Sequence, residues 1–142
     1  DGDPHVLAIA RRKASLADTE VDFREGLSVS LPYGNAEFDR VVSTLFFHHL
    51  NWPAKVRTAS ELFRVMKPGA ELHIADWGRP SNVLMGGLFV FVQLLDGFET
   101  TRDNRAGRLI PLFQTAGFRE VETSTRINTM FGTLRLYRAL RP

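Results

Sequence analysis

The sequence contains no cysteine among its 142 residues. Disulfide bonds, thiolate nucleophiles and cysteine-rich zinc sites are therefore excluded, and nothing argues for secretion into an oxidising compartment. The first residues also lack the basic-then-apolar pattern of a signal peptide. We therefore expect a cytoplasmic protein.

Long apolar runs are absent as well. The longest largely apolar stretch is VLMGGLFVFVQLL, residues 83–95, and a spanning helix needs about 20 such residues, so no membrane span is predicted. The net charge is only +2, which does not indicate a nucleic-acid partner. With 44% hydrophobic and 24% charged residues, the composition is typical of one globular domain with a sizeable core.

Helical and extended patterns alternate along the chain. Asp3 and Pro4 are suitable as the N-cap and first residue of a helix, and Asn51 is suitable as the cap of another. The expected elements are helix 4–16, strand 21–25, strand 38–46, helix 52–66, strand 71–77, helix 109–116, and strands 118–125 and 133–140. This order predicts an open, mostly parallel α/β sheet that ends in an antiparallel hairpin.

In such sheets ligands bind outside the carboxyl ends of the strands. The strand at residues 38–46 runs into LFFHHL, where two aromatic residues and two histidines stand in place of polar turn residues. The other predicted strand ends carry Asp1 and Gly2, residues 26–28, and Asp76 with Trp77. We expect these side chains to face a bound molecule.

Four segments, in order and spacing, resemble class I S-adenosylmethionine-dependent methyltransferases: DGDPHVLAIARRKA, LPYGNAEFDRVVSTLFFHHL, RVMKPGAELHIADW and FQTAGFREVE. The likeness covers nearly the whole chain and is to the small-molecule type that includes ubiquinone/menaquinone-biosynthesis methyltransferases. It implies a Rossmann-like methyltransferase fold and S-adenosylmethionine as cofactor. The implied reaction is direct displacement of the methyl group by a small, apolar or aromatic acceptor.

The resemblance also implies which residues hold the cofactor. Asp1 matches the acid that binds the ribose hydroxyls, and Gly2 matches the position beside the adenine ring. Leu27 and Ser28 match the segment after the family's third strand. The family commonly has an aspartate at the position of Leu27, which accepts from the adenine amino group. Here the adenine would lose that acceptor.

At the end of the family's fourth strand, Ser43 to Phe46 match the segment that passes the methionine part of the cofactor, and Thr44 and Leu45 are the expected contacts. His49 and Asp76 are the candidate general bases for an acceptor that must lose a proton. The alternative roles are a helix-start residue for His49 and a turn residue for Asp76. Neighbouring histidines on a strand end are expected to point in different directions, so no metal site is predicted for His48 and His49.

The resemblance is incomplete at the start of the chain. The family begins with a strand, a G-x-G-x-G loop and a helix, in a sheet of order 3-2-1-4-5-7-6, and this sequence contains no such loop. The first two strands of that sheet are missing. We therefore expect the chain to be the carboxyl-terminal portion of a longer protein.

A segment of 24 residues, 80–103, separates the strand at 71–77 from the next helix pattern. Leu88, Phe91, Val92 and Leu95 are predicted to share one helical face within it. We expect this segment to form a lid over an apolar substrate. Core packing and a homodimer interface are the alternatives for the same face.

Three alternative functions predict other sequence features. A short-chain oxidoreductase needs a tyrosine followed four residues later by lysine, and Tyr33 and Tyr137 are followed there by Glu37 and Arg141. The N/D-P-P-Y/F motif of nucleic-acid methyltransferases does not occur after residue 44. A non-catalytic, methyltransferase-like binding or scaffold protein stays open as the alternative.

Overall fold

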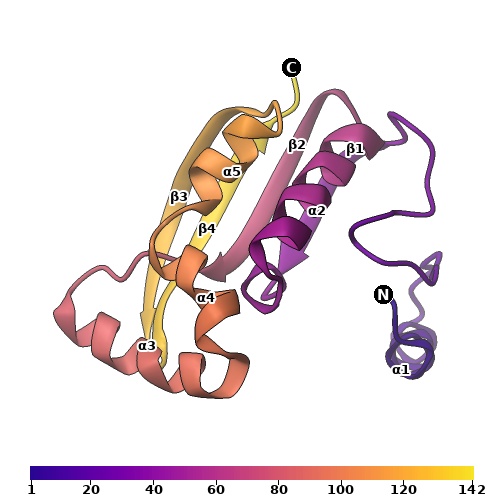
Figure 1. Cartoon of the computed structure of the whole chain (residues 1–142). Coiled ribbons are helices and arrows are strands. Elements are labelled where there is room, and N and C mark those ends of the chain that lie inside the picture. Colours follow the sequence, from indigo (N-terminus) through magenta and orange to yellow (C-terminus); the bar gives the residue numbers. More distant parts are fainter.

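A mixed four-stranded sheet forms the centre of the computed structural model, which describes residues 1–142 (Figure 1). Strand β1 (Phe38–Thr44) lies parallel to β2 (Met66–Trp77), with Val41 opposite Leu72 and Thr44 opposite Ala75. Strand β4 (Gly132–Leu140) runs antiparallel to both β2 and β3 (Arg119–Thr129), and the order is β1-β2-β4-β3. The predicted fold class and hairpin are confirmed. The sheet has one parallel pair and is not mostly parallel.

Helices α2 (Trp52–Val65) and α5 (Leu109–Thr115) cover one face of this sheet (Figure 1). Strand β2 alternates between buried and partly exposed residues, because only that face is covered. The core formed between the sheet and the helices consists of Phe47, Ala59, Leu62, Met66, Ala70, Leu72, Ile74, Leu109, Leu112, Phe113, Phe118, Tyr137 and Ala139.

The predicted helix starts are confirmed by the caps. Asn51 Oδ1 accepts from the backbone N–H of Ala54 at 3.0 Å, which fixes the start of α2. Asp3 Oδ1 accepts from the backbone N–H of His5 at 2.8 Å at the start of α1 (Pro4–Leu16). Helix α1 lies apart from the sheet and buries only Leu7 (Figure 1).

The strand predicted at residues 21–25 is not formed. That segment has no neighbouring strand with which to pair, so its apolar pattern cannot be used in a sheet. The chain there is extended between α1 and an isolated bridge that joins Leu27 to Ser30. On the outer edge of the sheet, Val42 of β1 is 68% exposed.

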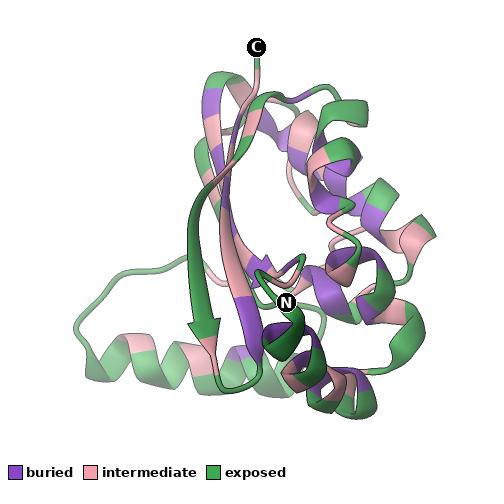
Figure 2. Cartoon of the chain, turned by 90° about the vertical axis from the view of Figure 1, so that its left-hand side faces the viewer, coloured by how far each residue is buried: buried purple, intermediate pink, exposed green.

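The segment predicted as a lid contains helix α3 (Val83–Asp96) and helix α4 (Phe98–Arg105). Helix α3 buries Phe89 and Val92, whereas Phe91 is 59% and Leu95 is 84% exposed. Leu88, Phe91, Val92 and Leu95 all lie within α3, as predicted, but Val92 is the only one of the four that is buried, and the helix packs through residues 85, 89 and 92. Most of α3 is exposed (Figure 2). None of the helices has both the length and the apolar character that crossing a membrane requires.

Candidate functional site

The carboxyl ends of β1 and β2 meet at one edge of the sheet, and Asp76 lies there fully buried. Its carboxylate accepts five hydrogen bonds, from the backbone N–H groups of Phe46 (3.1 Å), Phe47 (2.7 Å) and Trp77 (2.7 Å), His48 Nδ1 (2.7 Å) and Asn104 Nδ2 (3.2 Å). An ionised carboxylate only accepts, so this set fixes the proton of His48 on Nδ1. Asp76 therefore organises the rim of the sheet and has no free face.

The two histidines lie in the short 3-10 helix η1 (Phe47–His49), directly after β1. Leu45 has a φ of 50° and turns the chain at this point. The ring centroids of His48 and His49 are 4.0 Å apart, so the two side chains do not diverge as expected. The His48 side chain is buried, whereas that of His49 is 52% exposed.

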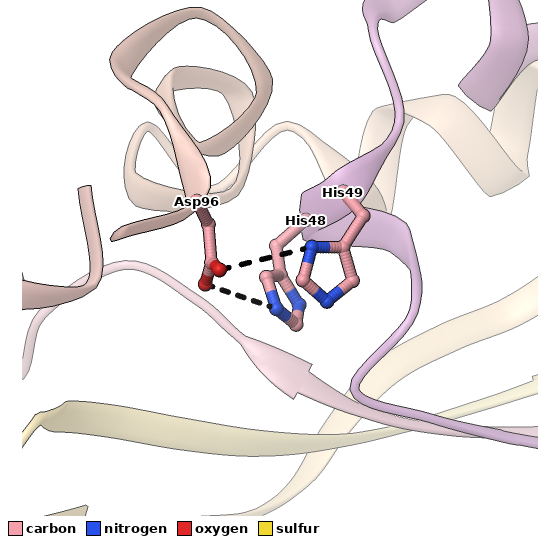
Figure 3. A group of neighbouring side chains, drawn as sticks. All are labelled: His48, His49 and Asp96. Atoms are coloured by element: carbon pink, nitrogen blue, oxygen red, sulfur yellow. Dashed lines mark ion pairs between the residues drawn. The ribbon is translucent and has the colours of Figure 1, made fainter. Parts of the chain in front are cut away.

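Asp96, the last residue of α3, faces both histidine rings (Figure 3). Its Oδ2 is 3.5 Å from His48 Nε2, and its Oδ1 is 3.9 Å from His49 Nδ1. This carboxylate is 47 residues beyond His49 in the sequence and comes from a different element. Sequence patterns carried no signal for it, since only the packing of α3 brings it to the rim.

Behind the rim, Lys55 is a buried cation that the sequence also gave no reason to single out. Its Nζ donates to the backbone oxygen of Thr100 at 2.5 Å and lies 3.8 Å from Asp103 Oδ2. Burial lowers the pKa of Lys55, and the attraction of Asp103 and Asp76 acts against that shift. Lys55 therefore connects α2 to α4 and so supports the rim from behind.

A hollow of about 440 Å³ opens beside β1, between the sheet edge and the N-terminal segment. Its polar lining includes Asp1, Ser28 and Ser43, and Ser28 Oγ shares a hydrogen bond of 2.9 Å with Thr58 Oγ1. Its apolar lining is formed by Leu31, Val41, Val42, Phe46, Phe47 and Leu62.

The structure brings two of the six predicted cofactor residues, Asp1 and Ser28, into the lining of this hollow. A Cβ atom on Gly2 would lie 2.8 Å from Leu27 Cδ2, so Gly2 and Leu27 pack directly together. Thr44 and Leu45 are exposed and are not part of the lining. Ser43 and Phe46, at the two ends of the same predicted segment, line the hollow.

These residues suit the nucleoside half of S-adenosylmethionine. A carboxylate and hydroxyl groups can bond to ribose hydroxyls, and the apolar walls can pack on a flat base. Leu27 is 63% exposed and offers the adenine no acceptor. The chemistry of the lining therefore fits that cofactor, with one polar contact fewer than the family pattern has.

Comparison with known proteins identifies the family. A model of a methyltransferase domain matches residues 1–69. A demethylmenaquinone methyltransferase of Deinococcus radiodurans is 30% identical over 140 residues, which are 96% of this chain and 57% of the relative. One from Thermus thermophilus is 36% identical over 83 residues, or 58% of this chain and 37% of the relative. The chain belongs to the class I S-adenosylmethionine-dependent methyltransferases.

Solved structures agree on the fold. A methyltransferase from Thermotoga maritima superimposes with a TM-score of 0.79 at 18% identity, over 100% of this chain and 71% of that one. A methyltransferase from Methanosarcina mazei gives 0.72 at 19% identity, over 99% and 77%. At these identities the likeness shows the fold alone. The chain spans little more than half the length of the first curated relative, and family membership implies S-adenosylmethionine as the cofactor.

Proposed function

We propose that the protein transfers the methyl group of S-adenosylmethionine to a small, apolar or aromatic acceptor. One observation carries the proposal: the hollow that suits the nucleoside and the histidine pair lie at the same end of β1. Phe46 lines that hollow, and the half-exposed His49 follows three residues later. The relatives named demethylmenaquinone methyltransferase support a quinol-like acceptor.

The chain's own residues would divide the work as follows. When bound, the cofactor supplies a methyl group on a positively charged sulfur, which is open to direct displacement. The Asp1 carboxylate accepts hydrogen bonds from the ribose hydroxyls, and the apolar lining keeps water from the reacting atoms. Positioning of the two reactants then supplies most of the rate enhancement.

His49 is the better placed of the two candidate bases. The His49 ring reaches solvent, whereas both carboxylate oxygens of Asp76 already accept hydrogen bonds from the protein. Asp96, 3.9 Å from His49 Nδ1, would stabilise the charged imidazolium that forms when His49 accepts a proton. In this proposal Asp76 acts as a positioning residue that holds η1, and through it His49, at the rim.

Helices α3 and α4 would form the lid over the acceptor. They pack beside η1 and the end of β2, where Trp77 and Phe89 are in edge contact at 5.9 Å between ring centroids. The exposed residues Phe91 and Leu95 give α3 an outward apolar surface that an apolar acceptor could meet.

The test is methyl transfer from radiolabelled S-adenosylmethionine to a demethylated naphthoquinol, using the natural protein that contains this chain. We expect His49→Gln to lower kcat by roughly a hundredfold, the low end of the range for a general base. His73→Gln, on β2 but outside both the histidine cluster and the lining of the hollow, serves as the matched control and should keep full activity. Binding of S-adenosylhomocysteine without transfer to any phenol or quinol would instead support the non-catalytic alternative.

A further inference from the structure

Three potential metal ligands converge at the rim (Figure 3). They are His48 and His49 of η1 and Asp96 of α3, and their ligand atoms all lie within 4.8 Å of one another. The shortest of these separations that involve Asp96 is 3.5 Å, from Oδ2 to His48 Nε2. Ligand atoms around a tetrahedral zinc ion are roughly 3.4 Å apart, given bonds of about 2.1 Å. Small side-chain rotations would therefore complete the geometry.

His48 is already oriented for such a role. Its Nδ1–H donates to Asp76 at 2.7 Å, which leaves the lone pair of Nε2 on the side that faces Asp96. A carboxylate on the far nitrogen of a ligating histidine is the usual outer-shell partner in metal sites, because it fixes the tautomer and the ring orientation. Asp76 is itself fixed by backbone N–H groups, so the ligand does not depend on the ion for its position.

We propose that His48 Nε2, His49 Nδ1 and Asp96 bind one divalent transition-metal ion of the zinc type. Two imidazoles with one carboxylate suit Zn²⁺ and similar divalent transition-metal ions, whereas Mg²⁺ prefers a set of ligands made up of oxygen atoms. Three protein ligands leave one coordination position open, and the exposed side of His49 gives that position access to solvent.

The ion would link α3 to η1 at the rim, because Asp96 belongs to α3 and the two histidines belong to η1. His49 Nδ1 cannot bind a metal ion and accept a proton at the same time, so the proposed methyl transfer uses the metal-free protein. The proposed metal site does not rest on the proposed methyl transfer, and binding is measured without any turnover.

The experiment is calorimetric titration of the protein with Zn²⁺, with Co²⁺ as a second probe whose visible absorption reports nitrogen ligation. We expect one ion per chain, no binding of Mg²⁺, and a rise in Tm of about 5–10 °C at a hundredfold excess over Kd. His49→Ala and Asp96→Asn should each weaken Zn²⁺ binding by more than about tenfold, since losing even an outer-shell partner costs 10–100-fold.

The chain supplies matched controls for these variants. It has four histidines and no cysteine, so His5→Ala and His73→Ala remove the only other imidazoles without touching the cluster. Both controls should bind Zn²⁺ like the wild type. Circular dichroism checks that each variant is folded. His49→Ala and Asp96→Asn both change residues outside the buried core, so neither is expected to unfold the chain. Zn²⁺ binding that survives in a folded His49→Ala/Asp96→Asn double variant, or no binding by the wild type, would overturn the proposal.

Discussion

The Oδ1 atom of Asp76 and the Nδ1 atom of His48 are 2.7 Å apart, and both side chains are buried. The contact joins the end of β2 to the turn that follows β1, across 28 residues of sequence. It makes the position of the exposed His49 depend on a carboxylate that no ligand can reach. The chemistry of the rim therefore begins with a structural hydrogen-bond network.

Replacing Asp76 with Asn should destabilise the fold strongly. An amide turns one acceptor oxygen into a donor, which would then face N–H groups that also donate. Hydrogen bonds to charged groups contribute about 1.5–3 kcal/mol each, so we expect a loss of about 3 kcal/mol or more. The measurement is the free energy of unfolding in urea.

The control is Asp39→Asn, which removes a carboxylate that pairs with Lys67 at 2.9 Å but is 82% exposed. That variant should lose less than about 1 kcal/mol. Equal losses in the two variants would show that the Asp76 network does not carry this stability.

The free energy of unfolding should fall in acid because of Glu71. Hydrogen bonds from Arg138 and His73 lower the pKa of Glu71 from 4.5 to about 2. A carboxyl group with a lowered pKa in the folded state stabilises the fold fully above the unfolded value, and this contribution is lost as the pH falls through the folded value. We therefore expect part of the stability to disappear between pH 4.5 and 2.

Urea unfolding at several pH values tests this assignment. Glu71→Gln should flatten the dependence in that window, whereas Glu20→Gln, which removes a carboxyl group that has no ion pair, should keep the wild-type slope. A Glu71→Gln variant with the wild-type slope would assign the acid sensitivity to other carboxyl groups.

Two phenylalanines two residues apart on α3 should behave in opposite ways. Phe89 is fully buried, and truncation to Ala should cost about 3–5 kcal/mol of stability. Phe91 is 59% exposed, and Phe91→Ala should change stability by less than about 0.5 kcal/mol. If α3 covers an apolar acceptor, Phe91→Ala should raise KM for that acceptor and leave the affinity for S-adenosylhomocysteine intact.

Steady-state kinetics and calorimetry on the same preparation separate these effects. An unchanged KM in Phe91→Ala would leave the exposed face of α3 without a role in acceptor binding. A shift from dimer to monomer in that variant would assign the face to contact between two copies.

The sequence could predict what depends on local pattern. The caps at Asp3 and Asn51, the two apolar strands and the terminal hairpin are all confirmed, because side-chain periodicity and capping chemistry decide them. The prediction of a strand at residues 21–25 was wrong, because a strand also needs a neighbouring strand and no local pattern indicates whether one is present.

The site was harder to predict for two physical reasons. Within the predicted segment from Ser43 to Phe46, only the two outer residues line the hollow, and the left-handed backbone of Leu45, which interrupts the alternation of β1, could not be predicted from the pattern. Asp96 reaches the histidines only through the packing of α3, a contact between segments far apart in the chain. Tertiary placement decides both features.

The last prediction concerns Leu27, which stands where the family commonly has an aspartate. Leu27 packs against Gly2 beside the hollow that Asp1 and Ser28 line, and its side chain is 63% exposed. Leu27→Asp should therefore cost little stability while it supplies an acceptor for an adenine amino group. A hydrogen bond of about 1.4 kcal/mol corresponds to a tenfold change in Kd, so we expect S-adenosylhomocysteine to bind about tenfold more tightly.

Calorimetric titration of the wild type and of Leu27→Asp with S-adenosylhomocysteine measures this gain in affinity. Val21→Asp is the matched control, because Val21 is also about half exposed and the substitution adds the same charge outside the lining of the hollow. Val21→Asp should leave the Kd for S-adenosylhomocysteine unchanged, because salt screens the long-range effect of an added charge. Equal gains in the two variants would mean that the added charge acts at a distance. No gain in Leu27→Asp would place the adenine away from Gly2 and Leu27, and so move the cofactor out of the hollow beside β1.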